Sequence, residues 1–185
     1  MGNIPKPQTG SRYIKLPKPG QSIKLRILSP FIEFYEAWKD NKPVRKLHAK
    51  EFGPLDYDKL DKQGKPQGPK YNMAGAAWQY DGENSKVGVL QIKQATVMTG
   101  FYDLDNNPEW GPITDYDIII KAADDGKSYS VLPCPKKELA SEIQVAWDGV
   151  TAFGSFDLRE LLRGGDPFNP QTANVRPKQD ADIPF

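Results

Sequence analysis

The fold is decided by a stretch near the middle of the chain, which reads Lys86-Val87-Gly88-Val89-Leu90-Gln91-Ile92-Lys93. This stretch is short, rich in branched apolar residues and alternating from Val89 onward, so it predicts a strand over residues 87–93. Because side chains alternate across a strand, Leu90 and Ile92 are expected on the core face and Gln91 and Lys93 on the other face.

The segments after this strand predict a short amphipathic helix and two further strands. The helix is expected over residues 94–104, and the strands over residues 115–121 and 128–132. A tight turn at residues 124–127 joins the two strands into a hairpin. The helical positions at core spacing are Ala95, Met98, Phe101 and Tyr102.

A strand, a helix, a strand and a hairpin in this order form the second half of an OB-fold, which is a small Greek-key barrel. The expected fold class is therefore mainly β: an OB-fold five-stranded barrel with a helix between strands 3 and 4. Flanking C-terminal helices and a disordered acidic tail are expected to follow the barrel.

The first strand of the barrel is predicted over residues 21–30, with a bend at Ser29-Pro30 after which the chain continues extended. Alternation turns Ile23, Leu25 and Ile27 towards the core and Lys24 and Arg26 outward. Outward cations on a barrel strand are candidates for contact with a polyanion.

The remaining pattern divides the chain into three parts. Residues 1–20 are expected to be a flexible basic arm, residues 21–163 an OB-fold domain with an insertion near residues 53–72, and residues 164–185 a disordered tail. Further extended segments are predicted over residues 31–39, 42–52 and 73–80.

Two helices are expected after the barrel. Pro135 has the residue type typical of a first helical position, and Asp157 is a helix-capping residue before a leucine-rich turn that ends at Gly164-Gly165. These helices are expected to pack on the barrel through Leu139, Ile143, Trp147, Leu158, Leu161 and Leu162.

Composition bounds the protein class. The 185 residues suffice for one domain with a real core, and no signal peptide or membrane-spanning stretch is expected. The single cysteine, Cys134, excludes an internal disulfide framework and favours a reducing compartment such as the cytoplasm. With His48 as the one histidine, no closed zinc site and no cofactor are expected.

Charge is distributed unevenly along the chain. Residues 1–50 hold eleven Lys and Arg against three Asp and Glu, whereas residues 101–185 hold eight against fifteen. A basic first part favours a polyanionic partner, and an acidic end can compete for the same surface. Ordinary solvated surface is the alternative interpretation of this asymmetry.

Aromatic and cationic residues interleave early in the chain. Aromatic rings can stack on exposed bases and cations can meet phosphates, as in proteins that bind single strands. The candidate DNA-binding residues are Lys24, Arg26, Phe34, Tyr35, Trp38, Lys42, Arg45, Lys46, Lys50 and Lys93.

Several of these rings have a competing interpretation as core residues. Phe34 and Trp38 can fill the barrel, and so can Trp78 and Tyr80. Alternation cannot turn every ring inward, so part of the set Phe34, Tyr35 and Trp38 is expected at the surface.

The sequence offers less support for catalysis than for binding of single strands. His48 has no nucleophile or carboxylate neighbour in the sequence, and no phosphate-binding loop or nucleophile elbow occurs. Asp115 and Asp117 flank a predicted strand start, where solvated turn carboxylates are the commoner case. A non-enzymatic protein is expected; a metal-dependent nuclease that assembles scattered aspartates remains the alternative.

Several ordered motifs resemble the single-stranded-DNA-binding proteins of tailed phages. They include Lys24-Leu25-Arg26-Ile27-Leu28-Ser29-Pro30, Asn41-Lys42-Pro43-Val44-Arg45, Gln91-Ile92-Lys93-Gln94 and Asp115-Tyr116-Asp117. The resemblance spans about residues 20–137 and implies an OB-fold with a basic, aromatic groove for single strands. Some members of that group hold zinc in an insertion, but residues 53–72 lack the cysteine ligands, so no metal is carried over.

The last residues of the sequence resemble the acidic C-terminal tip of bacterial single-stranded-DNA-binding proteins. A short acidic segment that ends in apolar residues can dock on a partner through a pocket and long-range attraction. The predicted docking residues are Asp180, Asp182, Ile183, Pro184 and Phe185.

The expected function is to coat and protect single-stranded DNA in replication, recombination or repair, in the host cytoplasm if a phage encodes the chain. The tip would recruit replication or recombination proteins. Besides the nuclease, an OB-type module that binds a protein or an oligosaccharide remains an alternative.

Overall fold

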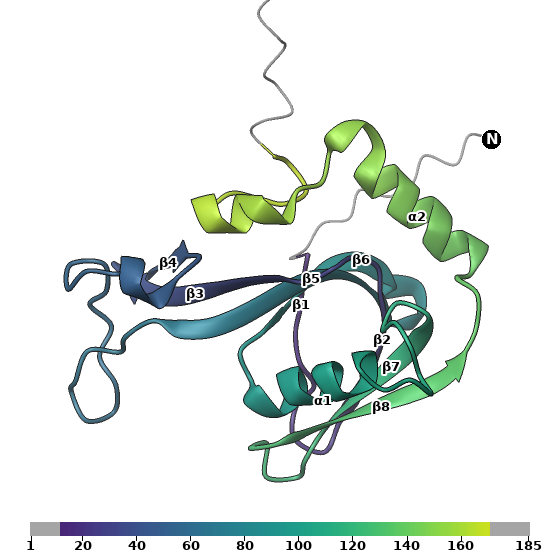
Figure 1. Ribbon diagram of the computed structural model, residues 1–185, viewed down its shortest axis with the longest axis horizontal. Helices are drawn as coiled ribbons and strands as arrows, with labels where there is room; N and C mark the ends of the chain where they lie inside the picture. Colours follow the sequence, from purple (N-terminus) through teal and green to yellow (C-terminus); the bar gives the residue numbers. More distant parts are fainter. Residues whose placement is uncertain (1–11, 171–185) are drawn as a thin grey trace, which may run out of the picture.

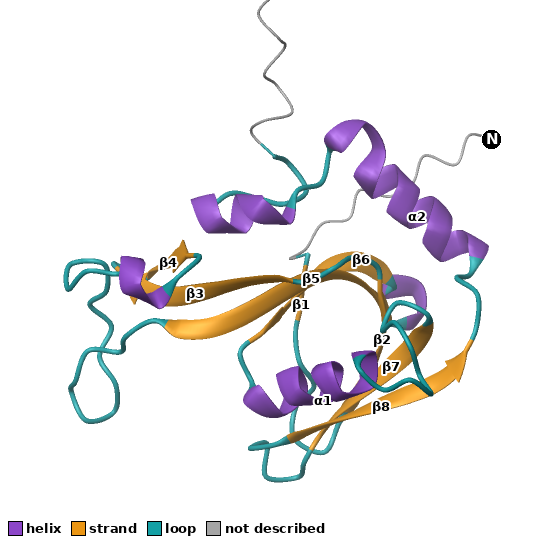
Figure 2. Cartoon of the chain, viewed as in Figure 1, coloured by secondary structure: helices purple, strands orange, loops and turns teal. Residues whose placement is uncertain are grey.

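The computed structural model describes residues 12–170, and the figures show how these residues are arranged (Figures 1 and 2). Eight strands of the described residues form one mixed sheet. The strands are β1 Tyr13–Ile14, β2 Ser22–Ile27, β3 Ile32–Lys39, β4 Lys42–Lys46, β5 Lys70–Tyr80, β6 Lys86–Ile92, β7 Tyr116–Ala122 and β8 Tyr129–Lys136. The α-helices are α1 Ala95–Asp105 and α2 Ser141–Thr151, and the short 3-10 helices are η1 Ala49–Glu51, η2 Gly82–Asn84, η3 Ala152–Gly154 and η4 Leu158–Arg163.

The long strand β5 connects the two halves of the sheet. Its first half pairs antiparallel with β3, where Phe34 lies opposite Asn72. Its second half pairs antiparallel with β2, where Arg26 lies opposite Trp78. Between the two halves, the Ala76 N–H donates to the hydroxyl of Ser29 at 2.9 Å. The expected bend at Ser29-Pro30 therefore lets one run of chain, β2 and β3, follow β5 along most of its length.

The strand order is β1-β6-β5-β2-β7-β8, with β3 and β4 beside the first half of β5. The mainly β class is confirmed. The closed five-stranded barrel is not: in the described residues the ladder is open, with β1 at one end and β8 at the other. The parallel pairing of β1 with β6 makes the sheet mixed.

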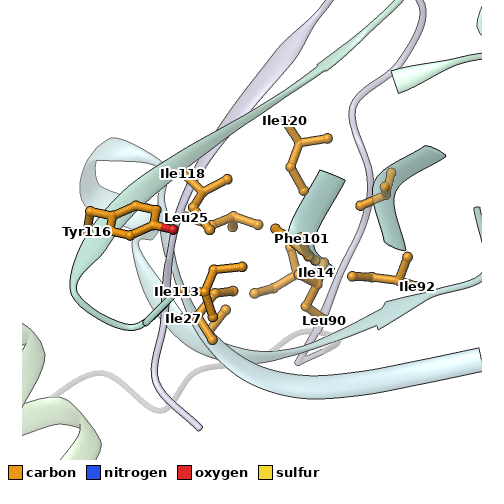
Figure 3. Close-up of a cluster of buried hydrophobic side chains, with 12 residues drawn as sticks. Ile14, Leu25, Ile27, Leu90, Ile92, Phe101, Ile113, Tyr116, Ile118 and Ile120 are labelled. Carbon is orange, nitrogen blue, oxygen red and sulfur yellow. The ribbon is translucent and has the colours of Figure 1, made fainter. Parts of the chain in front are cut away.

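The main core lies inside the curve of the sheet. Leu25, Ile27, Leu90 and Ile92 are at most 1% exposed, and Phe101 of α1 packs against them. Figure 3 shows these side chains pointing into one interior. The strand predictions for the core face of β2 and β6 are confirmed, although Ile23 is only partly buried. In α1 the buried residues are Val97 and Phe101, whereas Ala95 and Tyr102, predicted for the core, are exposed.

The outer face of β5 and β6 is also covered (Figure 1). Ile143 of α2 packs against Trp78 and Val87, and Leu158 and Leu161 of η4 pack with Phe34, Ala74 and Val89. Because both faces are buried, every residue of β5 from Ala74 to Trp78 is buried. The packing of the predicted C-terminal helices on the sheet is confirmed.

The predicted caps of the last described helix, η4, are confirmed at both ends. The carboxylate of Asp157 accepts the N–H of Arg159 at 2.9 Å at the start of η4. Gly164 ends η4 with φ of 72°, a left-handed conformation that glycine adopts without strain.

Other boundaries differ from the predictions. Pro135 does not begin a helix, because β8 continues to Lys136 and α2 begins at Ser141. β4 ends at Lys46 rather than continuing towards Phe52. β5 begins at Lys70, inside the expected insertion.

The two expected flexible segments are partly ordered. Within the expected arm, Ile14 pairs with Leu90 and is 5% exposed. Within the expected tail, Phe168 stacks edge-on against Phe156 at 5.1 Å between ring centres, and Arg12 lies 4.4 Å from its ring centre. Apolar contacts with the sheet and helices therefore hold residues that composition alone assigns to flexible ends.

Candidate nucleic-acid interface

A three-stranded arm of β3, β4 and the first half of β5 extends beyond the core (Figure 1). Alternation along β3 places Phe34, Glu36 and Trp38 on one face of this arm. Phe34 lies nearest the core and is fully buried, whereas Trp38 lies further out and is half-buried. The arm therefore carries a partly exposed indole ring away from the domain centre.

The loop of residues 47–69 folds back onto Trp38. The N–H groups of Asp58 and Lys59 donate to the Trp38 carbonyl at 3.0 and 3.3 Å. The N–H of Asp40 donates to the Asp58 carboxylate at 3.0 Å, and the N–H of Gln67 donates to Lys59 at 2.7 Å. These bonds make the expected insertion an ordered wall beside the ring.

The tip of this loop closes on itself. The carboxylate of Asp61 accepts the N–H groups of Gln63 and Lys65 at 2.8 and 2.9 Å. Leu60 and Pro66 form a bridge at the base of the turn. The tip is thus held by its own hydrogen bonds and not by the sheet.

Between the arm and the loop lies a cavity of about 200 Å³, here called the Trp38 pocket. Ligand sites of about 300–1,000 Å³ hold drug-sized molecules, so this pocket suits a smaller group such as one planar ring. Its lining residues are Glu36, Ala37, Trp38, Lys59, Gln67, Gly68, Lys70, Asn72 and Lys93.

Cations surround the indole ring of Trp38. The Nζ atoms of Lys59 and Lys93 lie 5.1 and 5.6 Å from its ring centre, within the range of a cation–π contact. Lys70 lines the same pocket and is exposed. Two ammonium groups therefore meet at one aromatic ring, and a third lysine lies in the wall of the same pocket.

The pocket also contains a buried carboxylate. Glu36 is 4% exposed and accepts hydrogen bonds from Arg45 Nε at 2.8 Å, Gln91 Nε2 at 3.0 Å and Lys93. Burial acts to raise the pKa of Glu36, but the bonds from Lys93, Gln91 and Arg45 outweigh it and hold the pKa below its ordinary value. Glu36 is therefore ionised at neutral pH.

Arg45 acts inside this network. Its side chain is 8% exposed, and besides Glu36 it donates to the Leu161 carbonyl at 3.1 Å. Arg45 thus ties β4 to η4. Arg45 was predicted to contact DNA from the surface. That prediction is wrong, because its guanidinium is buried and donates to groups of the protein itself.

Two more predicted contacts are corrected by burial. Phe34 is fully buried under η4 and has no free face for a base. Arg26 is 3% exposed, because its guanidinium reaches Asp117 Oδ1 at 3.5 Å and the Lys137 carbonyl at 2.9 Å. The outer face of β2 at Arg26 is covered by the chain that leads into α2.

Asp117 is the centre of a second ion-pair cluster. It is fully buried, and its Oδ2 atom lies 3.0 Å from Lys24 Nζ and 2.9 Å from Lys137 Nζ, while Tyr80 donates to Oδ1 at 2.9 Å. Burial acts to raise the pKa of Asp117, but the bonds from Lys137, Lys24 and Tyr80 lower it overall. The expectation of a solvated carboxylate at this position is wrong.

The other candidate residues are spread over different surfaces. Tyr35 lies on the opposite face of β3 from Trp38, 5.6 Å from Tyr71 between ring centres. Lys46 is paired with Asp56 at 2.7 Å. Lys42 and Lys50 are exposed. Of the predicted set, the Trp38 pocket brings together Trp38 and Lys93 only, with Arg45 behind them.

Sequence reasoning missed Lys59, Gln67 and Lys70, because they lie in or beside an insertion that has no periodicity. The repeated lysines of residues 59–70 were the available signal. The predicted docking residues 180–185 lie outside the residues that the structure describes.

A larger cavity of about 400 Å³ lies on the opposite face, between α1 and β5. Its walls include Phe31, Met73, Met98 and Phe101, and its charged groups are the carboxylates of Glu33 and Asp105. Carboxylates without a lining cation repel phosphate, so this cavity does not suit a DNA backbone.

Residues 12–170 contain no group of three or more His, Cys, Asp or Glu side chains placed to hold a metal ion. In the same described part of the chain, no helix has the length and apolar character needed to cross a membrane. Comparison of the chain with protein-family models, with curated proteins and with solved structures gave no match.

Proposed function

We propose that this protein binds single-stranded DNA through the Trp38 pocket. The observation that carries the proposal is that Lys59 and Lys93 lie against one half-exposed indole ring, in a pocket that Lys70 also lines. A ring with adjacent cations offers a stacking surface for a base and partners for the phosphates on either side of it.

A base of a single strand can replace a lysine ammonium on the Trp38 ring, and this exchange favours single-stranded DNA as the ligand. The ammonium groups of Lys59 and Lys93 lie against Trp38 in the free protein. A base that stacks on the ring displaces at least one of them, and the displaced ammonium can then meet a neighbouring phosphate. Stacking contributes about 1–3 kcal/mol per base and does not depend on the identity of the base.

The architecture we propose is an elaborated OB-fold. β2 with β3 corresponds to its first strand, β5 to its second and β6 to its third. α1 lies between β6 and β7, as the helix of an OB-fold lies between strands 3 and 4. OB-folds bind single strands over strands 2 and 3 and the neighbouring loops. The Trp38 pocket lies at the start of β5, beside the loop before it.

The biological role that we propose is to coat and protect single strands in replication, recombination or repair. The protein would act as a binding protein and not as an enzyme. Residues 180–185 would recruit partner proteins through their acidic and apolar side chains.

A salt titration with the full chain tests the proposal. We expect binding to a single strand of about 16 nucleotides, the upper end of the site size of one OB-fold, with little affinity for the duplex of the same sequence. The logarithm of affinity should fall with the logarithm of salt concentration by about 0.7 for each phosphate contacted. Equal affinity for duplex, or no dependence on salt, would overturn the proposal.

The same samples separate binding from cleavage. Incubation of the labelled strand with the protein and Mg²⁺ should leave its length unchanged. Shortened products would identify the protein as a nuclease instead.

A further inference from the structure

A carboxylate at a binding site for a polyanion needs a physical reason. Glu36 is buried in the wall of the Trp38 pocket and is held ionised by its partners. Its charge repels nearby phosphates and lowers the affinity for any strand. A carboxylate in this place is useful to binding when the ligand offers hydrogen-bond donors to it.

Glu36 has room for such donors on one side. Its Oε2 atom already accepts from Arg45 and Gln91, both of which are tied into the sheet and η4. Its Oε1 atom accepts from Lys93 alone, and the side chain of Lys93 is 43% exposed. Because an ionised carboxylate has about four acceptor sites, Oε1 can accept a further donor while Lys93 moves aside.

The position of Glu36 relative to Trp38 suits the edge of a stacked base. The two residues are two apart on one face of β3, so they are separated along the strand by about 6.6 Å. A base stacked on the indole ring can therefore direct an edge towards Glu36. Gly68, in the loop wall of the pocket, has no side chain to fill that space.

Guanine matches this arrangement among the four bases. Its Watson–Crick edge places the N1–H and N2–H donors side by side, next to the O6 acceptor. Both donors can converge on Oε1 once Lys93 moves aside, because that oxygen has two acceptor sites, and O6 can accept from the displaced lysine ammonium. Adenine and cytosine offer one donor beside a ring acceptor, and thymine offers one donor between two carbonyls, so each places an acceptor against the carboxylate.

We propose that the Trp38 pocket prefers guanine, with Trp38 as the stacking surface, Glu36 as the acceptor for N1–H and N2–H, and Lys93 as the donor to O6. This inference rests on the proposed function, because it assigns a base preference to the same pocket. The pocket would then accept strands of any sequence but would bind those that contain guanine more tightly.

The first test uses the unaltered full chain and changes only the DNA. Oligonucleotides of about ten thymidines, within the site size of one OB-fold, carry one central dG, dA, dC, dT or deoxyinosine. A bidentate base contact predicts that the dG strand binds at least about fivefold more tightly than the all-dT strand. Deoxyinosine lacks the N2 amino group and should bind with intermediate affinity.

The outcomes separate this inference from the function on which it rests. If all five strands bind equally and their affinity still falls with salt, the guanine preference is wrong and the proposed function stands. If none of the strands binds, the proposed function itself fails. A preference for another base also overturns the assignment.

The second test measures the ratio of dG to dT affinity in Glu36→Gln. This substitution retains the shape of the side chain. Because Arg45 and Gln91 hold the amide oxygen on their side, an NH2 donor replaces Oε1, and the ratio should fall to about one. A role for Glu36 limited to organising Arg45 and Lys93 would change both affinities by the same factor and leave the ratio intact. Glu33→Gln, on the opposite and exposed face of β3, is the matched control and should keep the preference.

Discussion

The backbone N–H of Lys59 donates to the carbonyl of Trp38 at 3.3 Å, and the Nζ atom of Lys59 lies 5.1 Å from the centre of the Trp38 ring. One residue of the loop is therefore joined to one residue of the strand by both its backbone and its side chain. This double contact holds the loop backbone beside the ring before any ligand arrives, so binding needs a lysine ammonium to move but no rearrangement of the backbone around the pocket.

Replacement of the indole ring should weaken DNA binding without unfolding the protein. We expect Trp38→Ala to reduce the affinity for single strands by about 1–3 kcal/mol, the usual contribution of stacking on one base. Fluorescence anisotropy measures the affinity and thermal unfolding checks the fold. Tyr102→Ala removes an exposed ring on α1 and should leave the affinity unchanged. Equal losses in both variants would contradict the assignment.

The pocket lysines should determine the dependence of affinity on salt. Each of Lys59→Ala and Lys70→Ala is expected to reduce the slope of log affinity against log salt by about 0.7, because one phosphate contact is lost. Lys127→Ala, in the turn between β7 and β8, is the control. An unchanged slope in the first two variants would place the DNA elsewhere.

The cluster around Asp117 should matter for stability and not for binding. In Asp117→Asn, the buried guanidinium of Arg26 loses its charged partner. Removal of one partner of a buried ion pair costs about 3–5 kcal/mol in the free energy of unfolding, which urea denaturation measures. Asp103→Asn, an exposed change on α1, should cost little. A loss in Asp117→Asn no larger than in this control would show that the cluster contributes nothing.

Acid should destabilise the fold through two buried, ion-paired carboxylates, Glu36 and Asp117. The pKa values of Glu36 and Asp117 lie below their ordinary values of 4.5 and 3.8. A lowered pKa means that the unfolded chain binds more protons, so the stabilisation is complete above these ordinary values and is lost as the pH falls below them. The free energy of unfolding should therefore decrease as the pH falls below about 5, and less steeply in Asp117→Asn. A curve of the same slope in that variant would exclude Asp117 as a cause.

Removal of residues 180–185 should leave DNA binding intact or tighter. The segment contains two aspartates, which can compete with phosphates for the lysines of the Trp38 pocket, and this competition weakens with salt. A truncated chain should thus bind single strands more tightly than the full chain at low salt and equally at high salt. Phe185→Ala keeps both aspartates and should bind like the full chain. Weaker binding after truncation would contradict this role.

The extended segments and caps were readable from local chemistry. The alternation of Leu90 and Ile92, the bend at Ser29-Pro30 and the cap at Asp157 depend on neighbours in sequence, and the structure confirms all three. The burial of Arg26 and Phe34 could not be predicted from neighbouring residues. Alternation assigns a side chain to one of two faces, but it exposes that side chain only if the second face meets water.

In this protein α2 and η4 cover the second face. The run of small residues Ala74-Gly75-Ala76-Ala77 in β5 was a signal for that cover, because strands buried on both faces are not alternating. The pocket itself was harder to predict, since Lys59 and Gln67 reach Trp38 through loop hydrogen bonds that leave no pattern in the sequence.

The self-closed turn at the tip of the loop offers a position for a reporter group. Asp61 holds Gln63 and Lys65 without help from the sheet, whereas Lys59 and Gln67 flank the turn and line the pocket. A dye at Gln63, which is exposed and does not have the positive φ of Gly64, would be carried on this turn only a few residues from the site, yet outside it. Such a labelled protein would report the arrival of a strand by a change in its emission, with the wall of the pocket left as it is.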